Sequence, residues 1–271
     1  MTKGRAVVHA VGSRAALRAI LAGVAAAVVG LGPVRVPARA AAVGGDQGVP
    51  VLMYHRVDRL LSARDAITVH LTVMQTAFEA QLQALRAAGY RSMSLEMLLT
   101  ALDGGAVPAR RVVLTFDDGY EDHFATVFPL LRKYGFAGTF FIVTSSVDSR
   151  DHLTMAQVRQ MAEAGMEIGT HGVHHVDFAQ LPLAAARAEL VQSRATLETW
   201  TGRRVVFFAY PAGRYSAALE GLLDTLGYQG ALSERPGFVT LNSPRYLLER
   251  VRVDHDDTAE SFARKVGLPA P

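Results

Sequence analysis

Apolar positions follow two alternating spacings from about residue 49 to residue 253. In the first, short runs of apolar and β-branched residues are continuous, which is typical of buried strands. In the second, apolar residues recur at every third or fourth position, which is typical of amphipathic helices. The runs predicted as strands are residues 49–57, 111–119, 137–143, 166–171, 205–213, 227–233 and 246–253.

The helical spacing is clear at residues 76–88, where Phe78, Leu82 and Leu85 share one face. Gly89 follows and is a typical helix end. Residues 59–72 show neither spacing and are predicted to form a loop. Further helices are predicted at residues 124–134, 154–164, 183–200 and 217–226, and between a cap at Ser94 and a stop at Gly104.

Strands that alternate with helices of this length indicate βαβ units and a mainly parallel sheet. About seven such units favour a closed barrel over an open, doubly wound sheet. No strand is followed by a glycine-rich phosphate-binding fingerprint, which weakens a nucleotide-binding interpretation. The sequence therefore predicts an α/β fold, a distorted (β/α) barrel of about seven parallel strands.

The composition narrows the possible chemistry. The chain has 271 residues and no cysteine, which excludes disulfides, thiolate metal ligands and cysteine nucleophiles. Any metal must therefore be held by His, Asp or Glu. The formal charge is +3, but residues 1–40 contain six basic side chains and no acidic one. The remainder has 22 basic against 25 acidic residues, a net charge of −3, so we expect no nucleic-acid partner.

The N-terminus has the layout of a signal peptide. A basic region to Arg18 precedes an uncharged run at residues 19–32, and small residues follow around Ala40 and Ala42. We predict a signal peptide at residues 1–42, a single catalytic domain at residues 43–271, and export to the periplasm or the extracellular space. The alternative is an uncleaved membrane anchor through residues 19–34.

Polar chemistry lies where four predicted strands end. These ends carry His55, the pair Asp117-Asp118, His171 and the segment at residues 210–213. In parallel α/β barrels the active site lies at the carboxyl ends of the strands. We therefore expect these side chains to converge.

Two of these strand ends together indicate a metal site. In the segment GTHGVHH, His171 and His175 are four residues apart, and His174 precedes the second. Two imidazoles and one carboxylate form a nitrogen and oxygen ligand set that suits zinc, cobalt, nickel or iron. Each element alone has a simpler explanation, since paired acids often cap a helix and histidine-rich loops are often solvated surface.

These motifs resemble the NodB-homology polysaccharide deacetylases, carbohydrate esterase family 4, over about residues 48–255. The family signature TFDDG is present at residues 115–119. The second signature, His-[Ser/Thr]-x-x-His, is present as HGVHH with Gly172 in the hydroxyl position. The surroundings AEAGMEIGTH and VVFFAYPAGRY are also similar to that family.

The resemblance implies roles for these residues. Asp117 would be the general base. One divalent metal ion, most simply Zn²⁺ with Co²⁺, Ni²⁺ or Fe²⁺ as alternatives, would be held by Asp118, His171 and His175. The metal would activate a water molecule and polarise the acetyl carbonyl. In the third motif, which contains Tyr210 and Pro211, the amide of Ala212 would stabilise the oxyanion.

The chain departs from the commonest family pattern. Ala209 stands where the third motif usually has an arginine that orients the catalytic Asp, and no late Leu-x-His motif is obvious. The branch acting on poly-β-1,6-N-acetylglucosamine also lacks that arginine and takes its acid from an N-terminal strand. We therefore predict His55 as the general acid, with His255 as the alternative. Arg250, on the last strand, is a candidate partner for an active-site acid.

Other side chains have less specific interpretations. Tyr54, Tyr120 and Tyr210 either line a sugar groove or pack in the core. His123 and His152 are expected at the surface.

The resulting hypothesis is a metal-dependent N-deacetylase of a polysaccharide that contains β-linked N-acetylglucosamine. A metal-dependent amidase for a small amide and a non-catalytic glycan-binding protein are the alternatives. We expect a polysaccharide as the partner, membrane contact only through the N-terminal segment, and a monomer.

Overall fold

Seven parallel strands close into a barrel within the part of the chain that the computed structural model describes, Met1 and residues 48–58, 65–105 and 109–268. The first barrel strand pairs with the last and also with the second, which closes the sheet. This confirms the predicted (β/α) barrel. The strands are β1 (Val51–Tyr54), β5 (Arg111–Phe116), β6 (Thr139–Ile142), β7 (Glu167–Thr170), β8 (Phe207–Ala209), β9 (Gly230–Pro236) and β10 (Leu248–Arg252).

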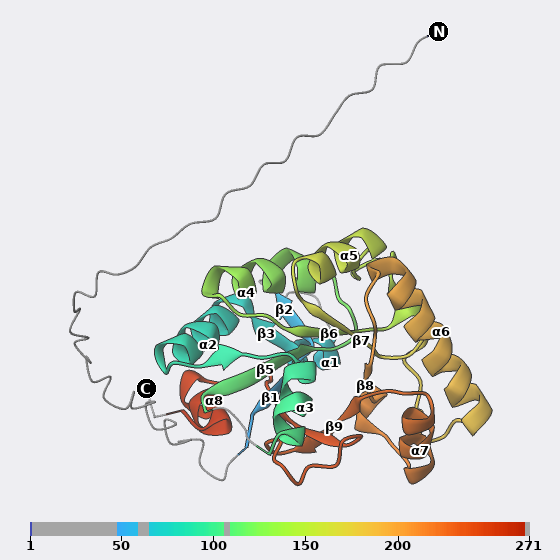
Figure 1. Ribbon diagram of the computed structural model, residues 1–271. Coiled ribbons are helices and arrows are strands. Elements are labelled where there is room, and N and C mark those ends of the chain that lie inside the picture. The colour runs from blue at the N-terminus through green and yellow to red at the C-terminus, as the bar shows by residue number, and fades with distance from the viewer. Residues whose placement is uncertain (2–47, 59–64, 106–108, 269–271) are drawn as a thin grey trace, which may run out of the picture. The chain divides into compact units, whose positions relative to one another are not determined.

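Helices surround the strands, as Figure 1 shows. Apolar faces at the helical spacing bring them onto the outer side of the barrel, where they bury residues such as Leu82, Leu131 and Val158. The helices are α2 (Gln75–Ala87), α3 (Leu95–Asp103), α4 (Phe128–Tyr134), α5 (Met155–Glu163), α6 (Leu183–Thr201), α7 (Ala217–Thr225) and α8 (Ala259–Val266).

The loop predicted at residues 59–72 is wrong for its second half. The structure has a short helix there, α1 (Ala66–His70), followed by β3 (Thr72–Met74), which pairs with β2 (Arg56–Asp58). Asp65 caps α1 by accepting the Thr68 amide. Elements of three to five residues are too short to show an apolar period. A two-residue strand, β4 (Arg91–Ser92), adds to the edge of β5.

Successive side chains along each strand point alternately into the barrel interior and toward the surrounding helices. On β5, Val112, Leu114 and Phe116 belong to the apolar cluster that packs against α2 and α4. Val113 belongs to a second cluster inside the barrel, with Phe141 and other residues. The period of two then points Thr115 and Asp117 to the interior as well. The carboxyl end of the barrel interior is therefore polar.

The same alternation on β10 places Leu248 in the interior cluster and directs Arg250 to the same side. Arg250 is 1% exposed, and Arg252, two residues further, lines a cavity at the open end. The barrel interior thus changes from aliphatic to charged toward the carboxyl ends of its strands.

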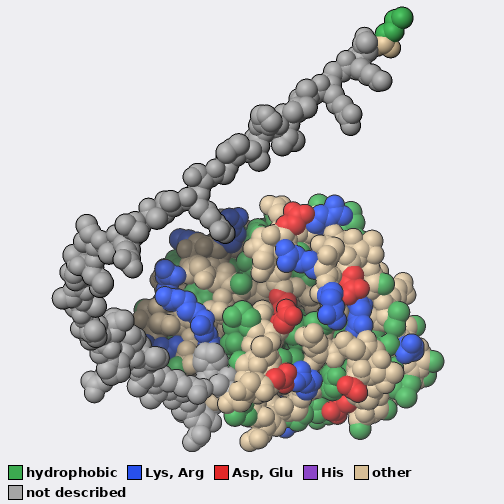
Figure 2. Space-filling view, in the orientation of Figure 1, with side chains coloured by type: hydrophobic (Ala, Val, Ile, Leu, Met, Phe, Trp, Pro, Cys, Tyr) green, Lys and Arg blue, Asp and Glu red, His purple; other side chains and the backbone are tan. Residues whose placement is uncertain are grey.

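No helix among the described residues has the length and apolar character needed to cross a bilayer. The predicted signal peptide, with its alternative anchor at residues 19–34, lies outside the described residues and stays a prediction. On the face seen in Figure 2, acidic and basic side chains lie next to each other at several places.

Gly169 gives a test of the interior packing. A Cβ on this β7 residue would lie 2.4 Å from a ring carbon of the fully buried Phe141. We expect Gly169→Ala to lower the free energy of unfolding by about 1–3 kcal/mol through overpacking, measured by urea denaturation. The matched control is Gly221→Ala on α7, where nothing lies within 4 Å and helix propensity should raise stability by about 0.5–1 kcal/mol. Equal effects of the two changes would contradict tight interior packing.

Candidate functional site

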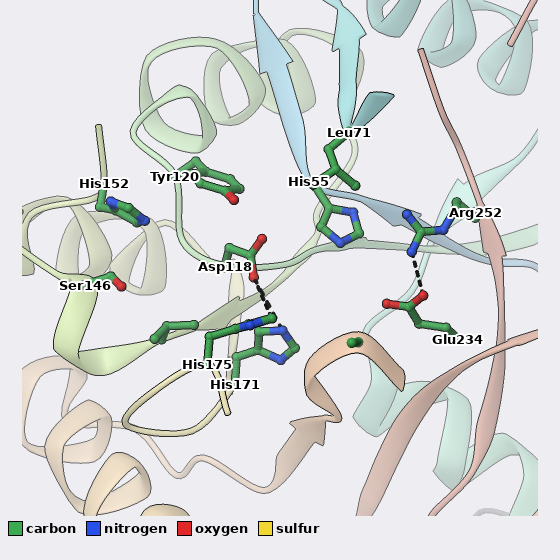
Figure 3. A pocket seen from close by; sticks show the side chains of 12 residues that line it. His55, Leu71, Asp118, Tyr120, Ser146, His152, His171, His175, Glu234 and Arg252 are labelled. Carbon is green, nitrogen blue, oxygen red and sulfur yellow. Dashed lines mark hydrogen bonds and ion pairs between the residues drawn. The ribbon is translucent and has the colours of Figure 1, made fainter. Parts of the chain in front are cut away.

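Asp118, His171 and His175 converge at the carboxyl end of the barrel. The Oδ1 atom of Asp118 lies 3.5 Å from the Nε2 atom of His171 and 3.5 Å from that of His175. One ligand atom from each residue lies within 4.8 Å of the other two. Figure 3 shows the three side chains pointing toward one another. The sequence placed Asp118 at one strand end and His171, with His175 four residues later, at another, and the fold brings them together.

The donor set fits a divalent metal. Ligand bonds of about 2.0–2.1 Å at tetrahedral angles separate two ligand atoms by about 3.4 Å, close to the 3.5 Å between the Asp118 Oδ1 atom and each histidine Nε2 atom. The Oδ1 atom of Asp118 is buried and has no hydrogen-bond donor. A buried carboxylate oxygen without a partner is costly, so a cation between the three residues would satisfy it. One carboxylate and two imidazoles suit zinc and its neighbours in the first transition series.

The His171 ring is held in the orientation that a metal ligand needs. Its Nδ1 atom lies 2.8 Å from the Ala209 carbonyl oxygen and donates to it, which leaves the Nε2 lone pair facing Asp118. Burial lowers the pKa of His171 below its ordinary value, although the nearby carboxylates oppose this shift. The neutral imidazole is the form that binds a metal.

A tight turn lets two adjacent acids serve one site. Consecutive strand residues point to opposite faces, but Asp118 has φ 76° and therefore leaves the strand conformation. Gly119 follows with φ 78°, next to Ile142. The backbone amide of Asp117 donates to the Tyr54 carbonyl at 3.0 Å. Asp117 thus points into the barrel directly after β5, while the side chain of Asp118 lies at the open end of the barrel.

Asp117 is paired with a buried arginine. The Arg250 Nη1 atom donates to Oδ1 of Asp117 at 2.9 Å, and Nη2 lies 2.8 Å from Oδ2. Both side chains are at most 1% exposed. Burial alone would raise the pKa of Asp117, but the Arg250 guanidinium, together with the nearby His171 and His55 rings, outweighs burial, so the pKa lies well below its usual range. Asp117 is therefore ionised at neutral pH.

Arg250 supplies the positive charge beside Asp117. Ala209 cannot supply it, because its side chain is an uncharged methyl group. The Arg250 Nε atom donates to the Ser233 carbonyl at 2.8 Å, which fixes the direction of the guanidinium. The sequence proposed Arg250 only as a possible partner of an active-site acid. The pattern that could have identified the pair is the period of two, which puts Arg250 and Asp117 on inner faces.

A cavity of about 360 Å³ opens over this cluster. As Figure 3 shows, the metal-ligand candidates lie in its middle, the Arg252–Glu234 pair lies to one side, and Ser146 and His152 lie to the other. The Nη2 atom of Arg252 lies 2.5 Å from the Oε2 atom of Glu234. The lining residues are His55, Leu71, Asp118, Tyr120, Val143, Ser146, His152, His171, His175, Ala212, Glu234 and Arg252.

The two candidate acids occupy different environments. His55 is 8% exposed and lines the cavity at the end of β1. His255 does not line it, and its Nδ1 atom lies 3.1 Å from the Thr72 carbonyl oxygen. Its backbone amide donates to the His70 carbonyl at 3.2 Å. The structure therefore brings His55 to the cavity that holds the three candidate metal ligands and leaves His255 outside.

The third-motif residues divide between cavity and core. Ala212 lines the cavity with φ 51°, in the 3-10 turn at residues 211–213. Pro211 has no amide hydrogen and the Gly213 amide donates to the Tyr210 carbonyl at 2.8 Å, so the Ala212 amide is the one without a partner within this turn. Pro211 and Tyr210 are buried and do not line the cavity. Tyr210 packs with Phe208 in an outer cluster, which is the packing alternative that the sequence left open for this residue.

Burial also decides between the sugar groove and the core for Tyr54 and Tyr120, and it tests the surface positions expected for His123 and His152. Tyr54 is buried and donates to Gln81 on α2 at 3.0 Å, whereas Tyr120 lines the cavity. His152 lines the cavity too. The expectation that His123 lies at the surface is wrong, because a π-helical turn at residues 123–127 folds it inward. There it is fully buried, and its Nε2 atom donates to the His55 carbonyl at 2.5 Å.

Sequence reasoning missed Glu234 and Arg252 as cavity residues. Arg252 follows Arg250 at the strand spacing of two, which was a usable signal. Glu234 gave none, because it lies one residue beyond the strand predicted at residues 227–233, whereas β9 continues to Pro236.

Comparison with protein families gives one match. Residues 104–231 match the family described as polysaccharide deacetylase. The chain is also similar to YxkH of Bacillus subtilis, with 29% identity over 79% of this chain and 74% of YxkH. The poly-β-1,6-N-acetyl-D-glucosamine N-deacetylase of Staphylococcus epidermidis is 24% identical over 76% of this chain and 78% of that protein.

Two solved structures are similar over most of the described fold. The deacetylase PplD of Streptococcus pyogenes, determined in complex with acetate, has a TM-score of 0.76 and 28% identity, covering 80% of this chain and 97% of that chain. IcaB of Ammonifex degensii has a TM-score of 0.68 and 25% identity, covering 82% of this chain and 96% of that chain.

Removing the charge of Arg250 should destabilise the barrel. In Arg250→Met a buried carboxylate loses its counter-charge, and we expect the free energy of unfolding at pH 7 to fall by about 3–5 kcal/mol in urea denaturation. The double variant Asp117→Asn/Arg250→Met should recover part of this loss. A loss below about 1 kcal/mol in the single variant would show that the pair is not buried as observed.

The same pair predicts a pH dependence. The folded pKa of Asp117 lies below its unfolded value, so its stabilising contribution is present above about pH 4 and is lost as the pH falls toward the folded pKa. In Arg250→Met, burial would instead raise the folded pKa of Asp117. The stability difference between wild type and Arg250→Met should therefore be largest near neutral pH and shrink on acidification, as followed by urea denaturation at several pH values.

Proposed function

The chain carries a polysaccharide deacetylase domain of the NodB-homology type, and from this premise we propose that it hydrolyses N-acetyl groups of a polymer containing β-linked N-acetylglucosamine in a metal-dependent reaction. The S. epidermidis relative named for poly-β-1,6-N-acetyl-D-glucosamine supports this polymer class. The similarity covers about three quarters of each protein.

One observation carries the proposal. The unpartnered Oδ1 atom of Asp118 faces two imidazole nitrogens, and the ionised Asp117 adjoins them at the same barrel end. A glycan-binding protein has no need for a buried carboxylate held by an arginine beneath a cation site. A hydrolase needs both, because a proton must be accepted close to the atom that a metal activates.

Each side chain then has a defined task. A divalent ion held by Asp118, His171 and His175 would supply Lewis acidity at the acetamide carbonyl and activate a water molecule. Asp117 accepts the proton of the attacking water, since a carboxylate has about four acceptor positions and Arg250 uses two. The Ala212 amide donates to the oxyanion that develops on the carbonyl.

The leaving amine needs a proton from the other side of the reacting carbon. We assign this step to His55, because it lines the cavity and its backbone carbonyl accepts a hydrogen bond from His123. Its ring lies within electrostatic reach of Asp117 and Asp118 and contributes to the lowered pKa of both carboxyl groups.

Acetate release tests the proposed reaction. The purified chain, supplied with Zn²⁺, should release acetate from poly-β-1,6-N-acetylglucosamine, chitin oligomers or peptidoglycan, lose this activity in a chelator and regain it with added metal.

Asp117→Asn should lower kcat by about 10²–10⁴-fold while about one Zn²⁺ per chain stays bound. Full activity of Asp117→Asn would exclude it as the base. Acetate release from small amides alone would favour an amidase, and zinc binding without any turnover would favour a glycan-binding role.

Comparing two histidine variants tests the acid. His55→Ala should lower kcat by about 10²–10⁴-fold because the departing amine is no longer protonated. His255→Ala, the matched control outside the cavity, should stay within about threefold of wild type. The opposite ranking in the acetate-release assay would assign the acid to His255.

A further inference from the structure

The loop that joins the two histidine ligands makes a tight reversal. Gly172 has φ 92°, and a Cβ there would lie 3.1 Å from the His174 carbonyl oxygen and 3.1 Å from the Phe178 ring. The Gly172 amide donates to the Thr170 hydroxyl at 3.1 Å. Such a turn leaves the next amides without partners inside it, so another element has to satisfy them.

A single glutamate on α6 supplies these partners. The Oε2 atom of Glu189 accepts the backbone amides of Val173 and His174, each at 2.8 Å. Its Oε1 atom lies 2.7 Å from the Nδ1 atom of His174. The Glu189 side chain is 15% exposed; its bond to the Val173 amide is partly buried, and its two bonds to His174 lie at the surface. One carboxylate thus forms hydrogen bonds with Val173 and His174, which lie between the metal-ligand candidates His171 and His175.

The opposite side of the loop is held as well. The carbonyl oxygens of Gly172 and Val173 accept the amides of Thr144 and Ser145 at 3.1 and 2.9 Å, from the 3-10 turn at residues 144–146. The amides are therefore held by Glu189 and the carbonyls by this turn. A loop fixed on both sides has little freedom left to lose when an ion binds.

This arrangement also accounts for the third histidine of the HGVHH segment. His174 lies outside the ligand set of Asp118, His171 and His175, and its side chain is 62% exposed. Its ring pairs with Glu189 instead. The three histidines therefore comprise two ligand candidates and one that ties the loop to α6.

We propose that Glu189 is a positioning residue that directs the Nε2 atoms of His171 and His175 onto one ion, and so sets the metal affinity of the site. This inference rests on the proposed metal-dependent function. Groups that orient ligands typically change metal affinity by about 10–100-fold when they are removed. A glutamine at this position keeps the shape but loses the charge and one of the two acceptor oxygens.

The test measures metal binding directly. Zinc affinity of the full chain is determined by competition with a chromophoric chelator, and cobalt absorption spectra report the ligand geometry. Glu189→Gln should raise the Kd for zinc about 10–100-fold and alter the cobalt spectrum. The matched control is Glu198→Gln on the same helix, where the carboxylate accepts the Val205 amide at 2.9 Å, away from the cavity. Glu198→Gln should leave both readouts unchanged.

Three outcomes would overturn the inference. Unchanged zinc affinity in Glu189→Gln would show that the contacts only stabilise the fold. Equal losses in Glu189→Gln and Glu198→Gln would show a general loss of stability. If wild type itself binds no zinc, the metal site and the proposed function fail together, a result distinct from the first two.

A second variant keeps the test available if Glu189→Gln does not fold. His174→Ala leaves both amide contacts in place and removes only the ring contact with Glu189. We expect it to raise the Kd for zinc about fivefold, which corresponds to one hydrogen bond. An unchanged Kd in His174→Ala would then contradict the positioning role.

Discussion

The buried ion pair between Asp117 and Arg250 is the constraint on which the polar end of this barrel depends. A carboxylate that is 1% exposed is tolerated only with a counter-charge and good hydrogen bonds. Arg250 provides both and also contacts Ser233 and Thr115, so one side chain of β10 joins β9 and β5. The pair lets the barrel interior change from aliphatic to ionic within one strand length.

The neighbouring carboxylate follows from that arrangement. Because Arg250 neutralises Asp117, Asp118 is left to a different partner, and its positive φ turns it over the mouth of the barrel. There it meets two imidazoles at 3.5 Å, with the His171 ring fixed by the Ala209 carbonyl. The two adjacent acids thus have separate surroundings: Asp117 pairs with Arg250, and Asp118 faces two imidazoles in a group that could hold a metal ion.

The cavity assembles its groups from elements with different supports. His55 ends β1, and His123 fixes its backbone carbonyl. Ala212 lies in a 3-10 turn after β8, and the histidine loop after β7 is held by Glu189 from α6. Such a division of roles is typical of parallel barrels, in which a rigid sheet carries loops that each contribute one function.

The sequence by itself determined the barrel and identified the candidate ligand set. The two apolar spacings along the chain predicted the strands and the helices. Asp118, His171 and His175 could be identified because each motif lies within a few consecutive residues. Only the tertiary structure decided that Arg250 pairs with Asp117, 133 residues away, and that Tyr54 and Tyr210 face the helices while His123 is buried. The physical reason is closure of the barrel. Which inner-face side chains meet depends on the register of β1, β5 and β10, and local spacing carries no information about that register.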